Sequence, residues 1–447
     1  MEEFEGGFDK WRKIIGLFAG PLLMIAILMK PTPSLTPEAH GLLAIIVLVV
    51  IFWVSEALPL GVTALMAPVL CIAFGVCDEK IAFANFAHPI IFLFLGSFIL
   101  AKAMEVHSID KIIAVKILSL KWVRASVLRF TFMFAFIIFA LSGWLSNTAT
   151  TAMMFPIAIS LIKRLEEITG VEMKRFGLGL MLITAYSASI GGVATPVGSP
   201  PNLIGIGMLE KMAGIKIGFF QWMLIAAPQS LIVFFAVYSF MYLVTMRSAK
   251  KYWNKELFAK LKQQTTSSLN RPQWNVIIAF SITVMLWIIP GIIMLVRGSD
   301  ALSYKWLSTY IPEASAAMIG AVLLFLLPAD LKTYRPAMGW KEAVDINWEA
   351  IFLFGGGLTL GTLMFKTGLS NAAAAAILEL IGNPSITKFT LLFCFLTNAA
   401  TELTSNTAMA NMAVPLSISL CQKSQLSPLI PALAATMGCS YAFMLPV

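Results

Sequence analysis

Two copies of the tripeptide Ser-Asn-Thr, Ser146–Thr148 and Ser405–Thr407, lie 259 residues apart in the chain. A helix that begins at such a motif offers free backbone N–H groups and a partial positive charge, and these residue types are good helix caps. Two helix starts of this kind could hold an anion without any Arg or Lys. The Asn and Ser oxygens, with unwound backbone carbonyls beside them, suit a hard monovalent cation such as Na⁺.

The motifs belong to a longer internal repeat. Ser146–Leu161 and Ser405–Leu420 are identical at nine of sixteen positions, and Ile91–Met104 resembles Ile351–Met364 at an offset of 260. Nearly equal offsets indicate that a whole bundle of helices was duplicated. Five predicted spans separate the two motifs, so the first would enter the membrane from inside and the second from outside. This inverted repeat is typical of secondary transporters with a site near the membrane midplane.

A second element follows the first motif. The sequence ATPVGSPPN, residues 194–202, must interrupt the helix predicted for 176–208, because proline removes a donor and clashes with the preceding turn. In the second half the chain stops at Pro446-Val447, which align with Pro196-Val197. A helix that ends at mid-membrane would leave costly unsatisfied carbonyls. We therefore expect that this chain lacks its C-terminus, including half of one site and one more helix.

The composition sets the class of protein. Of the 447 residues, 59% are hydrophobic and 12% are charged, and the mean hydropathy is +0.85. Soluble domains are less apolar and about twice as charged, so a soluble enzyme, a nucleic-acid-binding protein and a disordered protein are excluded. We predict an all-α polytopic membrane protein with spans near 14–30, 41–59, 61–77, 87–106, 176–208, 217–245, 274–297, 313–328, 347–366 and 424–447. The runs 126–163 and 386–422 are too long for one span, and each is predicted to be a re-entrant helical hairpin with its Ser-Asn-Thr motif at the tip.

The basic residues predict the topology. With the N-terminus in the cytoplasm, 22 of the 32 Lys and Arg fall inside, 9 fall outside, and Lys102 lies within a predicted span. This bias agrees with the positive-inside rule. We expect a multi-pass protein of the inner (cytoplasmic) membrane. The long polar segment Arg247–Gln273 is then a cytoplasmic connector, with a helix lying on the membrane surface.

Other polar residues in or near the spans are weaker candidates. Glu402 lies three residues before Ser405 and could orient that tip, whereas Glu56 and Glu349 fit interfacial positions. An intramembrane enzyme would need a catalytic set such as HExxH or GxSxG, and the sequence contains neither. A channel would need a continuous polar-lined pore, whereas the polar residues here cluster at two tips.

These motifs resemble those of the divalent anion:sodium symporters, the INDY-type sodium-coupled di- and tricarboxylate carriers. The resemblance covers essentially the whole chain and includes both Ser-Asn-Thr motifs, the Gly198–Asn202 break and Ile90–Phe98. It implies about 11 transmembrane helices (the last missing here), homodimers, and a scaffold that carries an elevator-type transport domain. We expect scaffold helices in 1–106 and 217–346, the transport part of the first repeat in 107–216, and the second-repeat part in 347–447.

The resemblance also implies site residues. The first Na⁺ site would use Ser142, Ser146, Asn147 and Gly198. The second would use Thr401, Thr404 and Asn406, plus a residue after Val447. The substrate carboxylates would meet Asn147, Thr148, Ser199, Pro200, Asn406 and Thr407. With Thr at both third positions we expect C4-dicarboxylates such as succinate, malate and fumarate, with Na⁺ co-transported. A Na⁺-independent dicarboxylate exchanger and a citrate or sulfate transporter of the same family remain alternatives.

Overall fold

The computed structural model describes residues 7–30, 32–253, 269–330, 332–333, 335–382 and 384–444. The chain forms two compact units, and each is described by itself. The terminal unit comprises Met1–Phe92, Pro200–Ile217 and Asn347–Val447, and the central unit comprises Leu93–Ser199 and Gly218–Ile346. Each unit contains one of the two Ser-Asn-Thr motifs.

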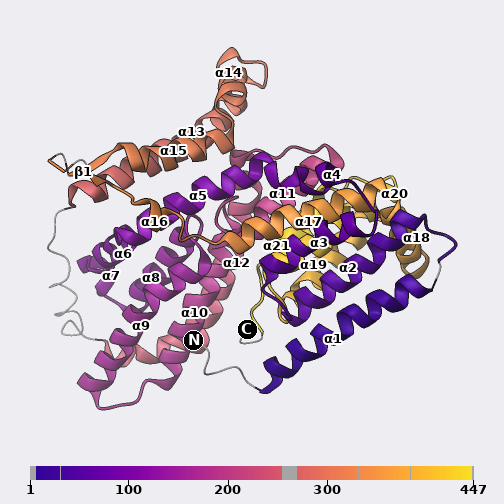
Figure 1. Cartoon of the computed structure of the whole chain (residues 1–447). Coiled ribbons are helices and arrows are strands. Elements are labelled where there is room, and N and C mark those ends of the chain that lie inside the picture. Colours follow the sequence, from indigo (N-terminus) through magenta and orange to yellow (C-terminus); the bar gives the residue numbers. More distant parts are fainter. Residues whose placement is uncertain are drawn as a thin grey trace. The chain divides into compact units, whose positions relative to one another are not determined.

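The regular elements of the terminal unit are all helices in the part of the chain that the structure describes (Figure 1). Helix α17 packs against α3, α11 and α20, and α19 packs against α21. Its elements are α1 (Gly7–Met29), α2 (Pro37–Ser55), α3 (Leu60–Ala73), α4 (Glu79–Ala84), η1 (Asn85–Ala87), α11 (Pro200–Ala213), α17 (Trp348–Lys366), α18 (Leu369–Ile381), α19 (Ile386–Thr401), α20 (Asn406–Lys423) and α21 (Leu429–Gly438).

The central unit is built around α10, which packs against α8, α9 and α12. Its elements are most of α5 (Pro89–Val106), then α6 (Ile109–Leu118), α7 (Lys121–Arg124), α8 (Val127–Ser142), α9 (Asn147–Thr169), α10 (Lys174–Val193), α12 (Phe219–Val244), η2 (Met246–Tyr252), α13 (Arg271–Arg297), α14 (Leu302–Tyr310), α15 (Glu313–Leu326), β1 (Pro328–Asp330), β2 (Arg335–Pro336) and α16 (Trp340–Ala343).

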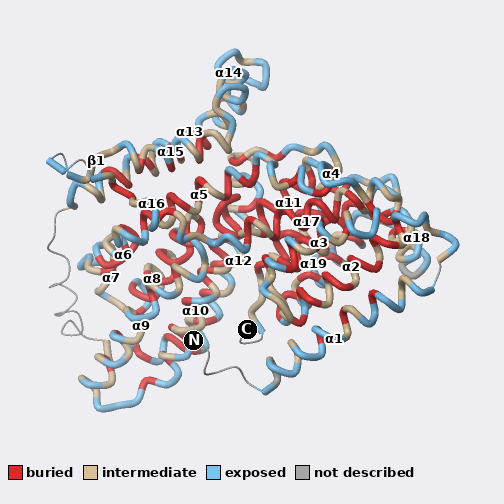
Figure 2. Tube along the Cα trace, in the orientation of Figure 1, coloured by how far each residue is buried: buried red, intermediate tan, exposed pale blue. Residues whose placement is uncertain are grey.

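The fold class predicted from composition is confirmed. Within the described residues, seven helices are long and apolar enough to cross a membrane, and the bent pair α14–α15 makes up to eight. The spans in α10 and α17 are 67% buried, whereas those in α12 and α13 are 22% buried (Figure 2). Helices α10 and α17 therefore form the protein-enclosed centre of each unit, while α12 and α13 keep apolar surface that lipid can cover.

Several details differ from the sequence-based expectations. The helix in the predicted span 424–447 is shorter than expected, because α21 ends at Gly438. In the same way, α10 ends at Val193, before an irregular segment. The short β1–β2 pair and helix α18 were not predicted. Residues 254–268 of the predicted surface helix lie outside the described residues.

The glycine triplet Gly355–Gly357 allows close packing of α17. A Cβ at Gly356 would lie 2.3 Å from the backbone oxygen of Ala64 on α3. Only hydrogen fits in that space, so α3 and α17 approach through their backbones.

Candidate functional site

The two hairpins are built alike from their first residue. Ser126 caps α8 by accepting from the Arg129 N–H, and Ser385 caps α19 by accepting from the Lys388 N–H. Both capped helices are 16 residues long. Each is followed by four residues outside the helix and then by a second helix that starts at the motif asparagine. We call residues 143–148 the Ser146 tip and residues 402–407 the Ser405 tip.

The Ser146 tip lies in the central unit. Ser146 is the N-cap of α9, and its hydroxyl accepts from the Ala149 N–H at 3.1 Å. Asn147 and Thr148 are the first two residues of α9. Ser142, the last residue of α8, is fully buried, and its Oγ lies 2.7 Å from Asn147 Oδ1 and 2.7 Å from the Ala188 carbonyl oxygen on α10.

The Ser405 tip in the terminal unit has the same core. Thr401, the last residue of α19, is buried, and its Oγ1 lies 2.6 Å from Asn406 Oδ1 and 2.9 Å from the Cys439 carbonyl oxygen. Ser405 precedes α20, but its side chain makes no capping hydrogen bond. In both tips a hydroxyl five residues before the asparagine joins that side chain to a carbonyl from the next helix.

Each core gathers three oxygens around one hydroxyl. Ser142 Oγ lies within hydrogen-bond distance of two oxygen acceptors, and so does Thr401 Oγ1. A hydroxyl carries one hydrogen and donates to one acceptor at a time. Clusters of hydroxyl, amide and carbonyl oxygens are the ligand type that hard cations prefer.

The segment after α10 brings more carbonyls to the Ser146 tip. The helix ends at Val193, and α11 begins at Pro200, where the missing proline N–H costs nothing. A Cβ at Gly198 would lie within 2.6–2.9 Å of the carbonyl oxygens of Gly192, Gly143 and Ser142. Thr195 Oγ1 also donates to the Gly143 carbonyl. Glycine is thus the one residue type at position 198 that lets this segment pack against three carbonyl groups.

Glu402 makes contacts that the sequence did not predict. Its buried carboxylate accepts from the backbone N–H groups of Phe443, at 2.7 Å, and Met444, at 3.1 Å. It therefore fixes the chain that follows α21. The aligned Pro446 and Val447 lie outside the described residues.

The sequence-predicted residues fall into two groups. Those in the central unit are Ser142, Ser146, Asn147, Thr148, Gly198 and Ser199; those in the terminal unit are Pro200, Thr401, Thr404, Asn406 and Thr407. Ser199 and Gly198 are buried, whereas the tip residues Ser146 and Thr148 are exposed. Sequence reasoning missed the carbonyl partners Ala188 and Cys439, and it missed Gly192, where a Cβ would lie 2.3 Å from Asn147 Oδ1. The glycine pair Gly191-Gly192, just before the interruption after α10, was the sequence signal that another segment approaches the backbone closely here.

The other acidic residues stabilise helix ends. Glu349 accepts from the Gly61 N–H at 3.2 Å near the start of α3. Glu56 has a left-handed backbone conformation at the end of α2 and pairs with Arg12 at 3.1 Å.

The helical spans define a polytopic membrane protein, and each of its two units has a polar tip at a helix start. The model for the sodium:sulfate symporter transmembrane region matches residues 11–447 of this chain. The chain therefore belongs to this family, the divalent anion:sodium symporters. It is a transporter rather than an enzyme, and Na⁺ is the co-transported ion.

Individual relatives agree with this assignment. The chain is 30% identical to a protein named sodium-dependent dicarboxylate transporter SdcS from Staphylococcus saprophyticus, over 97% of this chain and 83% of the relative. It is 32% identical to an uncharacterized transporter from Haemophilus influenzae, over 96% and 87%. The fold is similar to the crystal structure of the Alcanivorax borkumensis YdaH transporter, with a TM-score of 0.53 and 15% identity, over 98% of this chain and 87% of that one.

Proposed function

We propose that the protein carries C4-dicarboxylates such as succinate, malate and fumarate into the cell together with Na⁺. The observation that carries this proposal is the matched pair of oxygen cores, Ser142–Asn147 and Thr401–Asn406. Two equivalent cores, each made of a hydroxyl, an amide oxygen and a backbone carbonyl, fit two cation sites of the same chemistry.

Oxygen ligands alone make up the proposed Na⁺ sites. The first is formed by Ser142, Ser146, Asn147 and Gly198, and the second by Thr401, Thr404 and Asn406. Carbonyl and hydroxyl oxygens suit Na⁺, and transporter sites of this kind use the carbonyls of interrupted helices. Thr404 lies in the Ser405 tip, and its own hydroxyl contacts the Ser405 carbonyl at 3.4 Å, so its contribution to Na⁺ is best assigned to its backbone carbonyl.

The substrate anion is proposed to meet polar groups at both tips. The proposed ligands are Asn147, Thr148, Ser199, Pro200, Asn406 and Thr407. The starts of α9 and α20 provide N–H groups and a partial positive charge. Neither tip sequence contains Lys or Arg, so bound Na⁺ would supply the balancing charge. Relatives named as dicarboxylate transporters, at 29–30% identity, favour a dicarboxylate over the sulfate of the family's description.

The remaining features are proposed from the resemblance and the charge pattern. A homodimer with a scaffold and an elevator-type transport domain follows from the resemblance. An inner-membrane location with a cytoplasmic N-terminus follows from the excess of Lys and Arg in the segments assigned to the inside.

Uptake into proteoliposomes tests the substrate. Labelled succinate is supplied outside with NaCl or with KCl, and unlabelled malate, fumarate, citrate or sulfate is added as competitor. We expect uptake in NaCl only, reduced by malate and fumarate more than by citrate or sulfate. Equal uptake in KCl that requires internal dicarboxylate would show that the protein is an exchanger rather than a symporter. Competition by citrate or sulfate alone would show that one of these anions, rather than a C4-dicarboxylate, is the substrate.

A further inference from the structure

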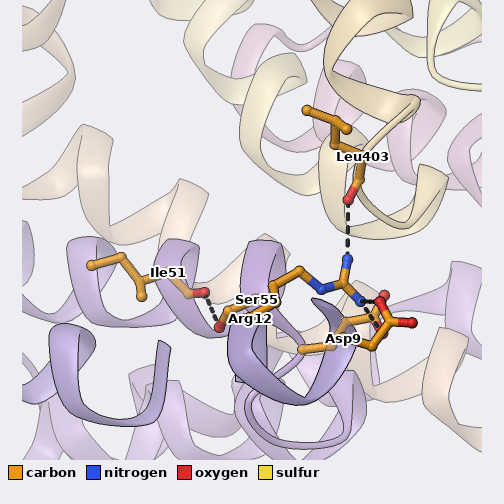
Figure 3. Close-up of polar contacts among 6 residues, drawn as sticks. Asp9, Arg12, Ile51, Ser55 and Leu403 are labelled. Carbon is orange, nitrogen blue, oxygen red and sulfur yellow. Dashed lines mark hydrogen bonds and ion pairs between the residues drawn. The ribbon is translucent and has the colours of Figure 1, made fainter. Parts of the chain in front are cut away.

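Arg12 reaches from the first helix to the Ser405 tip. Its Nη1 donates to the Leu403 carbonyl at 3.4 Å, and its Nη2 donates to Glu56 Oε2 at 3.1 Å (Figure 3). Asp9 Oδ1 lies 3.7 Å from the same Nη2. The guanidinium therefore joins α1, the end of α2 and the tip within the terminal unit.

Small residues bring α1 close enough for this contact. A Cβ at Gly16 would lie 1.9 Å from Ser55 Oγ, and one at Gly20 would lie 2.7 Å from the Phe52 ring. Arg12, Gly16 and Gly20 are spaced by four and lie on one face of α1. The glycines let that face of α1 pack closely against α2. The turn of α1 before Gly16 then places Arg12 beside Glu56, the residue that follows α2.

The charges around Arg12 argue against a direct role in binding substrate. Two carboxylates, Asp9 and Glu56, lie within ion-pair distance of its guanidinium. A dicarboxylate would have to compete with both for the same N–H groups. Arg12 is better suited to hold a neutral backbone carbonyl in place.

The two tips differ in this outer support. In the Ser146 tip, Thr195 donates to the Gly143 carbonyl, and Trp144 contacts the rings of Phe219 and Phe280. The equivalent of Trp144 in the Ser405 tip is Leu403, whose side chain is 59% exposed. Its carbonyl, rather than its side chain, is held by the rest of the unit.

We propose that Arg12 is a positioning residue for the Ser405 tip. By holding the Leu403 carbonyl, it fixes the chain two residues before Ser405 and three before Asn406, and so sets the geometry of the second Na⁺ site. This inference rests on the proposed function, because it assigns Arg12 to a Na⁺ site of that function.

The test compares Arg12→Gln, Arg12→Lys and the matched charge control Lys10→Gln, which alters an exposed lysine on the same helix. Labelled succinate uptake gives the Na⁺ concentration for half-maximal rate and the maximal rate. We expect Arg12→Gln to raise the half-maximal Na⁺ concentration about fivefold, with the maximal rate changed less than twofold. Arg12→Lys should recover part of the shift, and Lys10→Gln should match the wild type.

A second measurement, of thermal stability against NaCl concentration, serves if a variant transports too slowly for uptake to be analysed. The Tm of the purified protein is titrated with NaCl, and Arg12→Gln should need more Na⁺ for the same rise in Tm. If Arg12→Gln does not fold, Glu56→Gln should shift the Na⁺ dependence in the same direction, because it frees the guanidinium that Glu56 holds.

An unchanged Na⁺ dependence in Arg12→Gln, or an equal shift in Lys10→Gln, would overturn the role of Arg12 and leave the proposed function intact. Wild-type uptake without Na⁺ stimulation would overturn the proposed function and this inference with it.

Discussion

Removing the buried hydroxyl from each tip tests the matched cores most sharply. Ser142→Ala and Thr401→Val delete the hydroxyls that contact Asn147 and Asn406, and the second change preserves side-chain volume. Each deletion takes a donor from a partly buried amide oxygen and removes one oxygen from the proposed cation site.

The size of the effect follows from hydrogen-bond energetics. Leaving a buried polar group without its partner costs about 1–2 kcal/mol in such sites, which corresponds to about 5- to 30-fold in a binding constant. Because the two tips have the same local geometry, we expect shifts of similar size in the Na⁺ concentration for half-maximal uptake.

Two control variants separate this effect from general loss of packing. Thr401→Ser keeps the hydroxyl and should stay within about twofold of the wild type. Ser230→Ala removes a buried hydroxyl on α12 that has no hydrogen-bond partner among the described residues, so it should leave Na⁺ dependence unchanged. Wild-type Na⁺ dependence in both Ser142→Ala and Thr401→Val would show that these hydroxyls do not belong to Na⁺ sites.

Two further predictions concern the surroundings of the tips, and a third concerns helix α6. Gly192→Ala should abolish uptake, since its Cβ would lie 2.3 Å from Asn147 Oδ1, whereas Gly177→Ala meets only ordinary contacts at 3.5 Å and should transport normally; equal activity of the two would contradict the close approach. Glu402→Ala should lower Tm by leaving two backbone N–H groups without their acceptor, at about 1–3 kcal/mol each, and Glu402→Gln should lose less; a wild-type Tm for the alanine variant would disprove this anchoring role. Burial raises the pKa of Asp110 in α6, so the folded state binds the proton more tightly than the unfolded state and stability falls as pH rises above about 4. Asp110→Asn should therefore gain Tm relative to the wild type between pH 4 and 7, and a constant difference across that range would rule out this titration.

The sequence predicted the tips because they depend on local signals. Two Ser-Asn-Thr motifs in matched apolar runs marked where α9 and α20 begin, and Pro200-Pro201 marked an interruption near α11. These features depend on residue type and spacing alone, and a repeat within one chain doubles the signal.

The partners of the tips could not be predicted in the same way. Ala188 and Cys439 contribute backbone carbonyls, which any residue type carries, so their identity gives no signal. Glu402 lies near Ser405 in sequence, yet its carboxylate binds N–H groups about 40 residues later. Arg12 contacts a carbonyl 391 residues away. Contacts of this kind follow from how the helices pack, which local patterns do not specify.

Na⁺-coupled symport requires that an inward Na⁺ gradient drive substrate accumulation. Proteoliposomes with KCl inside are diluted into NaCl with labelled succinate, and internal succinate is followed over time. Coupled transport predicts a transient rise of internal succinate above its external concentration, which collapses when a Na⁺ ionophore is added. Internal succinate that rises only to the external concentration, with or without the gradient, would contradict Na⁺-coupled symport.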